Sequence, residues 1–221
     1  MEGSELDFYL SHGYFRMQQG LFTCRFIPVD DQLCPVHWLR IVLAKVQYGP
    51  KQRRLLRSND HFSVINKPFA LTAELETLYA LYRSSLDFDA PESVEACLLG
   101  EADRNGFDTW VIEVRDGSTL IAAGIFDNGW RSIAGIMNFY HPAYRKHSLG
   151  KYLMLSKMAD AERRQKAYYY PGYIASDYAK FDYKLFACEA ATEVFDAGRG
   201  YWLPFSWETV ATLATEIRNE D

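Results

Sequence analysis

The fold of this protein is decided by the stretch at residues 138–155, NFYHPAYRKHSLGKYLML. The apolar run at residues 130–140 predicts a strand, which His141-Pro142 ends because proline cannot donate to a ladder. A basic loop at 144–150 leads into a helix predicted over 151–165, and a strand follows at 168–174. The chain is therefore expected to contain a strand–loop–helix–strand unit in which the loop opens the helix.

Further elements are predicted on both sides of this unit. Asp116-Gly117 predicts the turn of a hairpin between strands 109–115 and 119–126. Thr72 is the expected N-cap of a helix over 71–85, and Pro91 opens a helix that reaches residue 100. The remaining predictions are strands at 39–46 and 192–195, helices at 178–188 and 207–218, loops with short strands over 5–38, and a helical turn or exposed loop at 51–57.

This pattern predicts an α+β fold with a mixed, mainly antiparallel sheet flanked by helices. We expect residues 1–70 to form a smaller N-terminal subdomain and residues 71–221 to form the main domain. The chain is 48% hydrophobic, which is ample for a core, but it has no apolar run of about 18 residues that would predict a membrane span. The first residues lack the features of a signal peptide, so a cytoplasmic location is expected.

Cysteine and histidine spacing gives no sign of a metal site. The four cysteines contain no Cys-x-x-Cys pair, and no two histidines lie at the spacing of one helix face. We therefore expect reduced thiols, no metal and no cofactor.

Charge is distributed unevenly along the chain. Net charge is -5, but segments 45–57 and 145–166 each carry +5, which leaves -15 for the rest. Such segregation is typical of a polyanion site on an acidic protein. Two solvated basic faces that never meet in space would give the same pattern, so charge alone leaves both interpretations open.

The loop at 145–151 is the candidate anion site. Backbone N–H groups at a helix N-terminus have no intrahelical partner, and the helix dipole favours negative charge there. Gly150 allows a ligand to approach the backbone closely, and Arg145, Lys146 and Lys151 add positive charge. A capping loop that binds nothing is the competing interpretation of this short pattern.

In this context the loop resembles the pyrophosphate loop of the GNAT acyltransferase superfamily, although Ser148 stands at its first glycine. Residues 138–142 and 148–155 more closely resemble the arginyl-tRNA–protein transferases and the bacterial leucyltransferases, with their Phe-Tyr-x-Pro and Ser-Leu-Gly-x-Tyr-Leu motifs. Further stretches that resemble this family lie at 10–16, 52–54, 58–60, 113–117, 122–127, 168–174 and 179–184. The resemblance covers residues 7–203 and implies a GNAT-like fold.

The resemblance implies that an amino acid passes from charged tRNA to the N-terminal amine of proteins that begin with Asp or Glu. A covalent nucleophile is not expected, because the ester is already activated. The catalytic group stays unidentified, with candidates Tyr140, His147 and Tyr173. The residues expected to bind aminoacyl-tRNA are Arg53, Arg54, Arg57, Arg145, Ser148, Leu149, Gly150 and Lys151. Those expected to bind the acceptor are Arg16, Lys180, Tyr183 and Lys184. Asp127 or Glu113 would serve as a base only if it faced the cleft.

Two alternatives remain open at this stage. One is a coenzyme A-dependent N-acyltransferase of the same superfamily. The other is a relative that binds tRNA or acidic N-termini without transfer, because the N-terminal cysteine cluster of many family members is absent and Tyr178-Ala179-Lys180-Phe181 replaces their Cys-Pro-Lys-Met. The sequence also leaves open whether arginine or leucine is donated.

Overall fold

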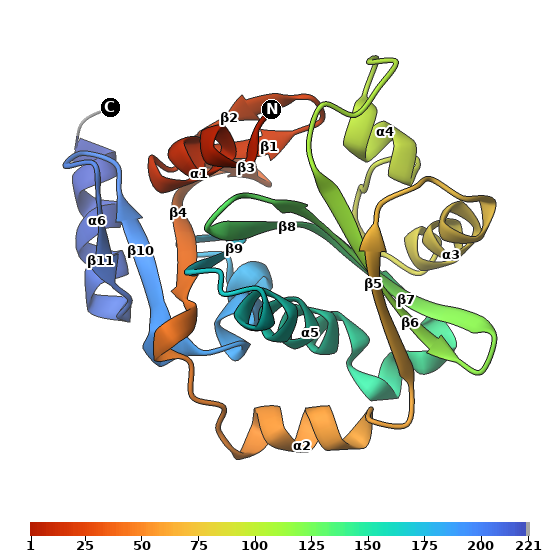
Figure 1. Ribbon diagram of the computed structural model, residues 1–221. Helices are drawn as coiled ribbons and strands as arrows, with labels where there is room; N and C mark the ends of the chain where they lie inside the picture. The colour runs from red at the N-terminus through yellow and green to blue at the C-terminus, as the bar shows by residue number, and fades with distance from the viewer. Residues whose placement is uncertain (220–221) are drawn as a thin grey trace.

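The centre of the molecule is one nine-stranded sheet, which a computed structural model of residues 1–219 describes (Figure 1). Its strands are ordered β11-β10-β4-β9-β8-β7-β6-β5, and β3 pairs with β4 outside this path. The strands are β3 (Phe26–Val29), β4 (Gln32–Val42), β5 (Ser63–Pro68), β6 (Thr109–Asp116), β7 (Thr119–Asn128), β8 (Ser132–Tyr140), β9 (Tyr168–Ala175), β10 (Thr192–Asp196) and β11 (Tyr201–Pro204). A separate hairpin joins β1 (Phe15–Met17) to β2 (Gly20–Phe22).

Helices cover both faces of this sheet. The α-helices are α1 (Gly3–Ser11), α2 (Pro50–Ser58), α3 (Ala73–Arg83), α4 (Val94–Leu99), α5 (Leu149–Arg163) and α6 (Trp207–Asn219). Short 3₁₀ helices are η1 (Leu43–Lys45), η2 (Pro142–His147), η3 (Ala179–Phe186) and η4 (Glu189–Ala191). Figure 1 shows α5 lying across the sheet, with α2 below it. No helix within residues 1–219 combines the length and apolar character needed to cross a membrane.

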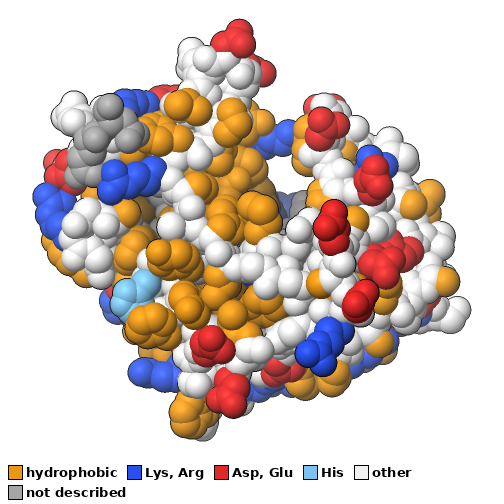
Figure 2. Space-filling view, turned by 90° about the horizontal axis from the view of Figure 1, so that it is seen from above, with side chains coloured by type: hydrophobic (Ala, Val, Ile, Leu, Met, Phe, Trp, Pro, Cys, Tyr) orange, Lys and Arg blue, Asp and Glu red, His pale blue; other side chains and the backbone are white. Residues whose placement is uncertain are grey.

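Alternation along the strands places two cores on opposite sides of the sheet. Ile112 of β6 is buried in the core beneath α5, whereas its neighbour Val111 is buried in the core beneath α3 and α4. This is expected because successive side chains of a strand point to opposite faces. In the view of Figure 2, hydrophobic side chains line a central hollow and most charged side chains lie around it.

The pair β8–β9 is the one parallel pair among the described strands, and it opens along its length. Residues 132–134 pair with residues 168–170, and no further pairs continue this ladder. Beyond that point β8 remains hydrogen-bonded to β7, with a bulge next to Gly135, while β9 remains hydrogen-bonded to β4. Pro171 offers no N–H, and Gly172 has φ +99°, a backbone that favours glycine. The two strands therefore diverge and leave space between them.

The elements with strong local signals are confirmed. The hairpin forms as β6 and β7, and the Thr72 hydroxyl accepts a hydrogen bond from Leu75 N at 3.2 Å at the start of α3. The order strand, loop, helix, strand is also present, as β8, η2, α5 and β9. The α+β fold with a mainly antiparallel sheet is thus as expected.

Several boundaries differ from the predictions. The segment 5–38 holds a helix, α1, whose Leu6 and Leu10 are buried. β4 begins at Gln32 rather than residue 39, and the segment 178–188 forms the 3₁₀ helix η3. α4 begins after Ser93, whose hydroxyl accepts from Ala96 N, rather than at Pro91. β5 and β11 carried no clear signal in the sequence.

A division of the chain at residue 70 would cut through the sheet. β4 lies at its centre between β10 and β9, and β5 forms its edge beside β6. Both strands come from residues 1–70, yet they pair with strands of residues 71–221. Hydrogen bonding between distant segments therefore joins the two parts that the sequence analysis separated.

Candidate active site

A cavity of about 250 Å³ occupies the space between the diverging strands β8 and β9. Its walls are largely aromatic. Phe15 stacks on Trp38 with ring centroids 4.0 Å apart, and Tyr173 meets the Trp38 ring edge-on at 5.0 Å. The other aromatic residues of this interstrand cavity are Phe22, Tyr169, Phe181 and Tyr183.

Two lysines also line the interstrand cavity. Lys157, on α5, has no exposed surface, and burial lowers its pKa to about 7, although Asp127 acts in the opposite direction. Burial likewise lowers the pKa of Lys184 to about 7, against the opposing effect of Asp182. Of the residues that the structure describes, no Asp or Glu lines this cavity. It is therefore a pocket with aromatic walls and an excess of positive charge.

A second pocket of about 370 Å³ lies at the N-terminus of α5. It is lined by Tyr82, Asn138, Tyr140, Arg145, Ser148, Gly150, Lys151 and Tyr183. Asn138 and Tyr183 line both this loop pocket and the interstrand cavity. The two spaces therefore meet at these two residues.

The loop pocket contains the backbone N–H groups at the start of α5, which have no partner within the helix. Ser148 adopts the left-handed conformation (φ 49°, ψ 45°), which ends η2 and starts α5. Within residues 1–219, no side chain caps α5. Its first N–H groups and the positive end of its dipole thus face a pocket that also contains Arg145 and Lys151.

The side chain of Leu149, a residue expected to bind aminoacyl-tRNA, does not face the loop pocket. Its side chain is fully buried in the core beneath α5. Only the backbone amide of Leu149 can therefore face a ligand in the loop pocket.

The basic helix α2 is anchored beside this loop. Near its N-terminus Gln52 donates to Phe186 O at 2.6 Å, and the ammonium of Lys151 lies 4.7 Å from the Phe186 ring centroid. Just past its C-terminus, Asn59 donates to His147 O at 3.1 Å. Both contacts tie α2 to the surroundings of the loop, so the two basic segments meet in space.

The arginines of α2 point to solvent. Arg53, Arg54 and Arg57 are all exposed, and Arg53 donates to Tyr48 O. In the described part of the chain, Arg54 and Arg57 make no ion pair or hydrogen bond. They are therefore available to a polyanion that extends beyond the loop pocket.

His147 lies outside both pockets. Its ring packs near Phe62 at 5.1 Å and His61 at 6.0 Å. Desolvation lowers its pKa, and the positive charges of Lys146 and His61 act in the same direction. The structure thus does not bring this candidate base to the cleft, whereas Tyr140 and Tyr173 line the loop pocket and the interstrand cavity, respectively.

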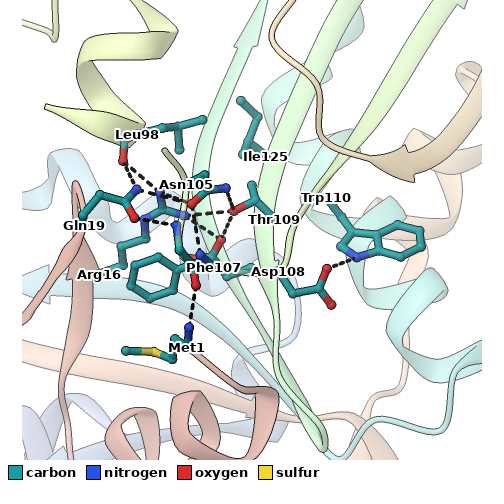
Figure 3. Close-up of polar contacts among 12 residues, drawn as sticks. Met1, Arg16, Gln19, Leu98, Asn105, Phe107, Asp108, Thr109, Trp110 and Ile125 are labelled. Carbon is teal, nitrogen blue, oxygen red and sulfur yellow. Dashed lines mark hydrogen bonds and ion pairs between the residues drawn. The ribbon is translucent and has the colours of Figure 1, made fainter. Parts of the chain in front are cut away.

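Arg16 is not a free cation for an acceptor, because internal partners use every donor of its guanidinium (Figure 3). It donates to Asp127 at 2.8 Å, Thr109 at 3.0 Å and Asn105 at 3.0 Å. The carbonyls of Gln18 and Leu98 accept its two other hydrogens. The side chain is 1% exposed and lines the interstrand cavity, but its donors are already used within the protein. Acceptor binding by Arg16 therefore stays a prediction.

The two candidate carboxylate bases are also engaged elsewhere. Asp127 is fully buried against Arg16, and burial raises its pKa, although the Arg16 charge opposes this shift. Glu113 is buried between Lys67 at 2.7 Å and Arg115 at 3.0 Å. Neither residue lines the interstrand cavity or the loop pocket.

The remaining acceptor candidates are divided by the structure. Tyr183 and Lys184 line the interstrand cavity, but Lys180 does not. The Lys180 ammonium instead lies 3.4 Å from the centroid of the Phe88 ring. Lys180 therefore bridges η3 to the segment that follows α3.

Sequence reasoning missed Asn138 and Lys157 as site residues. A signal existed for Lys157, because it interrupts the buried, mostly apolar face that runs from Leu153 to Met158 and Ala161. Within residues 1–219, no group of three or more His, Cys, Asp or Glu side chains could hold a metal ion.

Comparisons with known proteins identify relatives of this chain. Residues 69–187 match the family model described as "Arginine-tRNA-protein transferase, C terminus". An "Aspartate/glutamate leucyltransferase" of Rhodopseudomonas palustris (strain HaA2) is 27% identical over 83% of this chain and 75% of that relative. One of Thiobacillus denitrificans is 29% identical over 60% of this chain, which spans only 56% of that relative's length.

A solved structure supports the fold alone. "The structure of L-PGS from Bacillus licheniformis" superposes with a TM-score of 0.51 at 11% identity, covering 97% of this chain and 69% of that one. The family match spans more than half of the 221 residues. The chain therefore belongs to the arginine-tRNA-protein transferase family.

Proposed function

We propose that this protein is an aminoacyl-tRNA–protein transferase, which moves an amino acid from charged tRNA to the N-terminal amine of acceptor proteins beginning with Asp or Glu. The observation that carries this proposal is the meeting of two different pockets at Asn138 and Tyr183. One pocket offers bare amides and cations, and the other offers aromatic walls with two lysines. Transfer between two substrates requires such a junction.

The loop pocket suits the 3′ end of the tRNA. A phosphate placed at the start of α5 would meet unpaired N–H groups, the helix dipole and the charges of Arg145 and Lys151. The exposed arginines of α2 would follow the backbone of the acceptor stem, because phosphate contacts dominate nucleic-acid affinity.

The interstrand cavity suits the N-terminus of the acceptor. Lys184 would pair with the acidic side chain, and the tyrosines and Trp38 would hold the backbone. Removal of a carboxylate from water is costly unless a cation compensates it, and this cavity contains two lysines and no competing acid among its described lining.

The reaction needs positioning more than a nucleophile. The neutral acceptor amine attacks the ester carbonyl, and the tetrahedral intermediate then expels the 3′ oxygen of the tRNA. Cys188 is buried, its thiol donates to the carbonyl of Gln47 at 3.9 Å, and it lines neither pocket.

Leucine fits the site better than arginine as the donated residue. Among the described residues, neither the loop pocket nor the interstrand cavity has an Asp or Glu lining. An arginine side chain in either space would have no anionic partner and would face nearby cations. An apolar side chain would instead pack against the aromatic walls.

A transfer assay tests the proposal. Purified protein is mixed with an Asp-initiated peptide and tRNA charged with radiolabelled leucine or arginine. We expect label to enter the peptide from leucyl-tRNA, and a peptide with an acetylated N-terminus is the matched control. Transfer from arginyl-tRNA alone would overturn the donor assignment. Binding without any transfer would overturn the enzyme assignment, and micromolar binding of acetyl-coenzyme A would favour an N-acyltransferase instead.

A further inference from the structure

Asn138 stands where the two substrates would meet. It lies on β8 beyond the last residue that pairs with β9, and it lines both the interstrand cavity and the loop pocket. A side chain at this junction can reach a group that enters from either space.

The amide of Asn138 has a defined orientation. Its Oδ1 accepts a hydrogen bond from the Lys157 ammonium at 2.9 Å. Nζ also faces the carbonyl oxygens of Ile125 and Met137, so it acts as a donor here, and Oδ1 faces Lys157 while Nδ2 lies on the other side. Within residues 1–219, Nδ2 has no hydrogen-bond partner. Asn138 therefore presents an unused donor at the junction.

Lys157 is itself held in place by the sheet. It donates to Ile125 O at 2.8 Å and lies 3.4 Å from Met137 O, where β8 bulges away from β7. Gly124 makes this arrangement possible, because a Cβ there would lie 2.9 Å from both Asn138 Oδ1 and Lys157 Cε. The donor direction of Asn138 is thus fixed by packing from α5 and β7.

We infer that Asn138 is a catalytic residue whose Nδ2 donates a hydrogen bond to the oxyanion of the tetrahedral intermediate, with Lys157 as its positioning residue. The inference rests on the proposed function. Oxyanion donors act when they are already oriented at the site where charge develops. Asn138 meets that condition at the point where ester and amine would come together.

The step that Asn138 assists is balanced without further reactants. The amine nitrogen forms a bond to the ester carbon, and the carbonyl oxygen becomes the oxyanion that Nδ2 stabilises. Collapse breaks the bond to the 3′ oxygen, which takes the proton lost by the amine. The products are an amide and an uncharged tRNA.

The test is steady-state transfer by Asn138→Ala and Asn138→Asp. Loss of one oxyanion donor is expected to reduce kcat by about 10²- to 10³-fold, with KM for peptide and charged tRNA within about threefold. Asn138→Asp keeps the shape of the side chain and its contact with Lys157 but removes the N–H donor. Its kcat therefore tests the role of the donor even if the alanine variant fails to fold. Asn66→Ala, at a partly buried asparagine on edge strand β5, is the matched control and should keep full activity.

The role of Lys157 is tested by coupling. Lys157→Met should reduce kcat because the Asn138 amide can then rotate away from the reacting group. The loss should be smaller than in Asn138→Ala, because the amide donor is still present. In an Asn138→Ala background the same change should have no further effect on kcat. Additive losses would show that Lys157 acts independently of Asn138, and would overturn its positioning role.

The outcomes separate the inference from the function on which it rests. Failure of the wild-type protein to transfer any amino acid would overturn the proposed function and, with it, this role of Asn138. Transfer by the wild-type protein with kcat kept within about threefold in folded Asn138→Ala or Asn138→Asp would overturn the inference alone.

Discussion

Two buried cations in this protein have opposite surroundings. Arg16 lines the interstrand cavity, but it is paired with Asp127 and all five of its donors are used by other groups of the protein. Lys157 is also buried, but neutral oxygens of Ile125, Met137 and Asn138 hold it at the wall of the interstrand cavity. A carboxylate neutralises the charge of Arg16, whereas no carboxylate is bonded to Lys157, whose pKa burial lowers to about 7.

The comparison shows how burial separates structure from function. Arg16 ties the β1–β2 hairpin to β6, β7, α4 and the segment that follows α4, so its loss should affect folding first. Lys157 bears a charge that burial disfavours, and no bonded carboxylate compensates it. Buried groups kept at such a cost occur most often at functional sites.

The largest expected effect comes from breaking the Arg16 pair. Arg16→Met leaves Asp127 buried without its partner and should lower the free energy of unfolding by about 3–5 kcal/mol. Urea unfolding followed by circular dichroism measures this change. Glu216→Gln, which breaks an exposed pair with Arg199, is the control and should have a much smaller effect.

Replacing both partners sharpens this result. Arg16→Met combined with Asp127→Leu should recover part of the lost stability, because no uncompensated charge remains. A double variant less stable than Arg16→Met would contradict the role of unpaired charge.

The second prediction concerns the pH dependence that Lys157 imposes. Its pKa is about 7 in the folded protein and 10.5 as its ordinary value. Between these values the unfolded chain keeps the proton that the folded protein releases, so stability rises with pH. Relative to Lys157→Met, the wild-type protein should gain about 1.4 kcal/mol between pH 6 and pH 8.

Denaturant unfolding of both proteins at these two pH values measures the gain. Lys184 also has a lowered pKa, but it is present in both proteins, so its contribution cancels in the difference. An unchanged difference, or one that falls with pH, would show that Lys157 keeps an ordinary pKa.

The sequence predicted what depends on neighbours along the chain. The Asp116-Gly117 turn, the Thr72 cap and the basic loop before α5 all follow from residues a few positions apart. For the same reason Arg145, Ser148, Gly150 and Lys151 could be grouped as one site, and the structure gathers them in the loop pocket.

The sequence could not predict what depends on pairing across the sheet. Arg16 looked like a free cation because its partner Asp127 lies 111 residues away. The position of Asn138 at the site depends on the divergence of β8 from β9 and on the contact between its amide and Lys157. Neither feature follows from the residues next to Asn138 in the sequence. β4 belongs to the main sheet through pairs with β9, which no local pattern records.

The smallest expected effect extends the comparison to cations on the surface. Arg54 and Arg57 of α2 are exposed and, unlike Arg16, have no ion-pair partner within the described chain. Arg54→Ala with Arg57→Ala should weaken tRNA binding a few-fold and reduce the slope of log affinity against log salt by about 1 to 2. Filter binding from low to moderate salt measures both quantities.

Arg163→Ala provides the matched control, because this exposed arginine is already paired with Asp160 at 2.8 Å. It should leave the salt slope unchanged, since a cation neutralised by its own protein releases few counterions from tRNA. Equal slopes in all three proteins would remove α2 from the tRNA path. The loop pocket would then have to bind the 3′ end alone, and the free arginines beside it would serve only solubility.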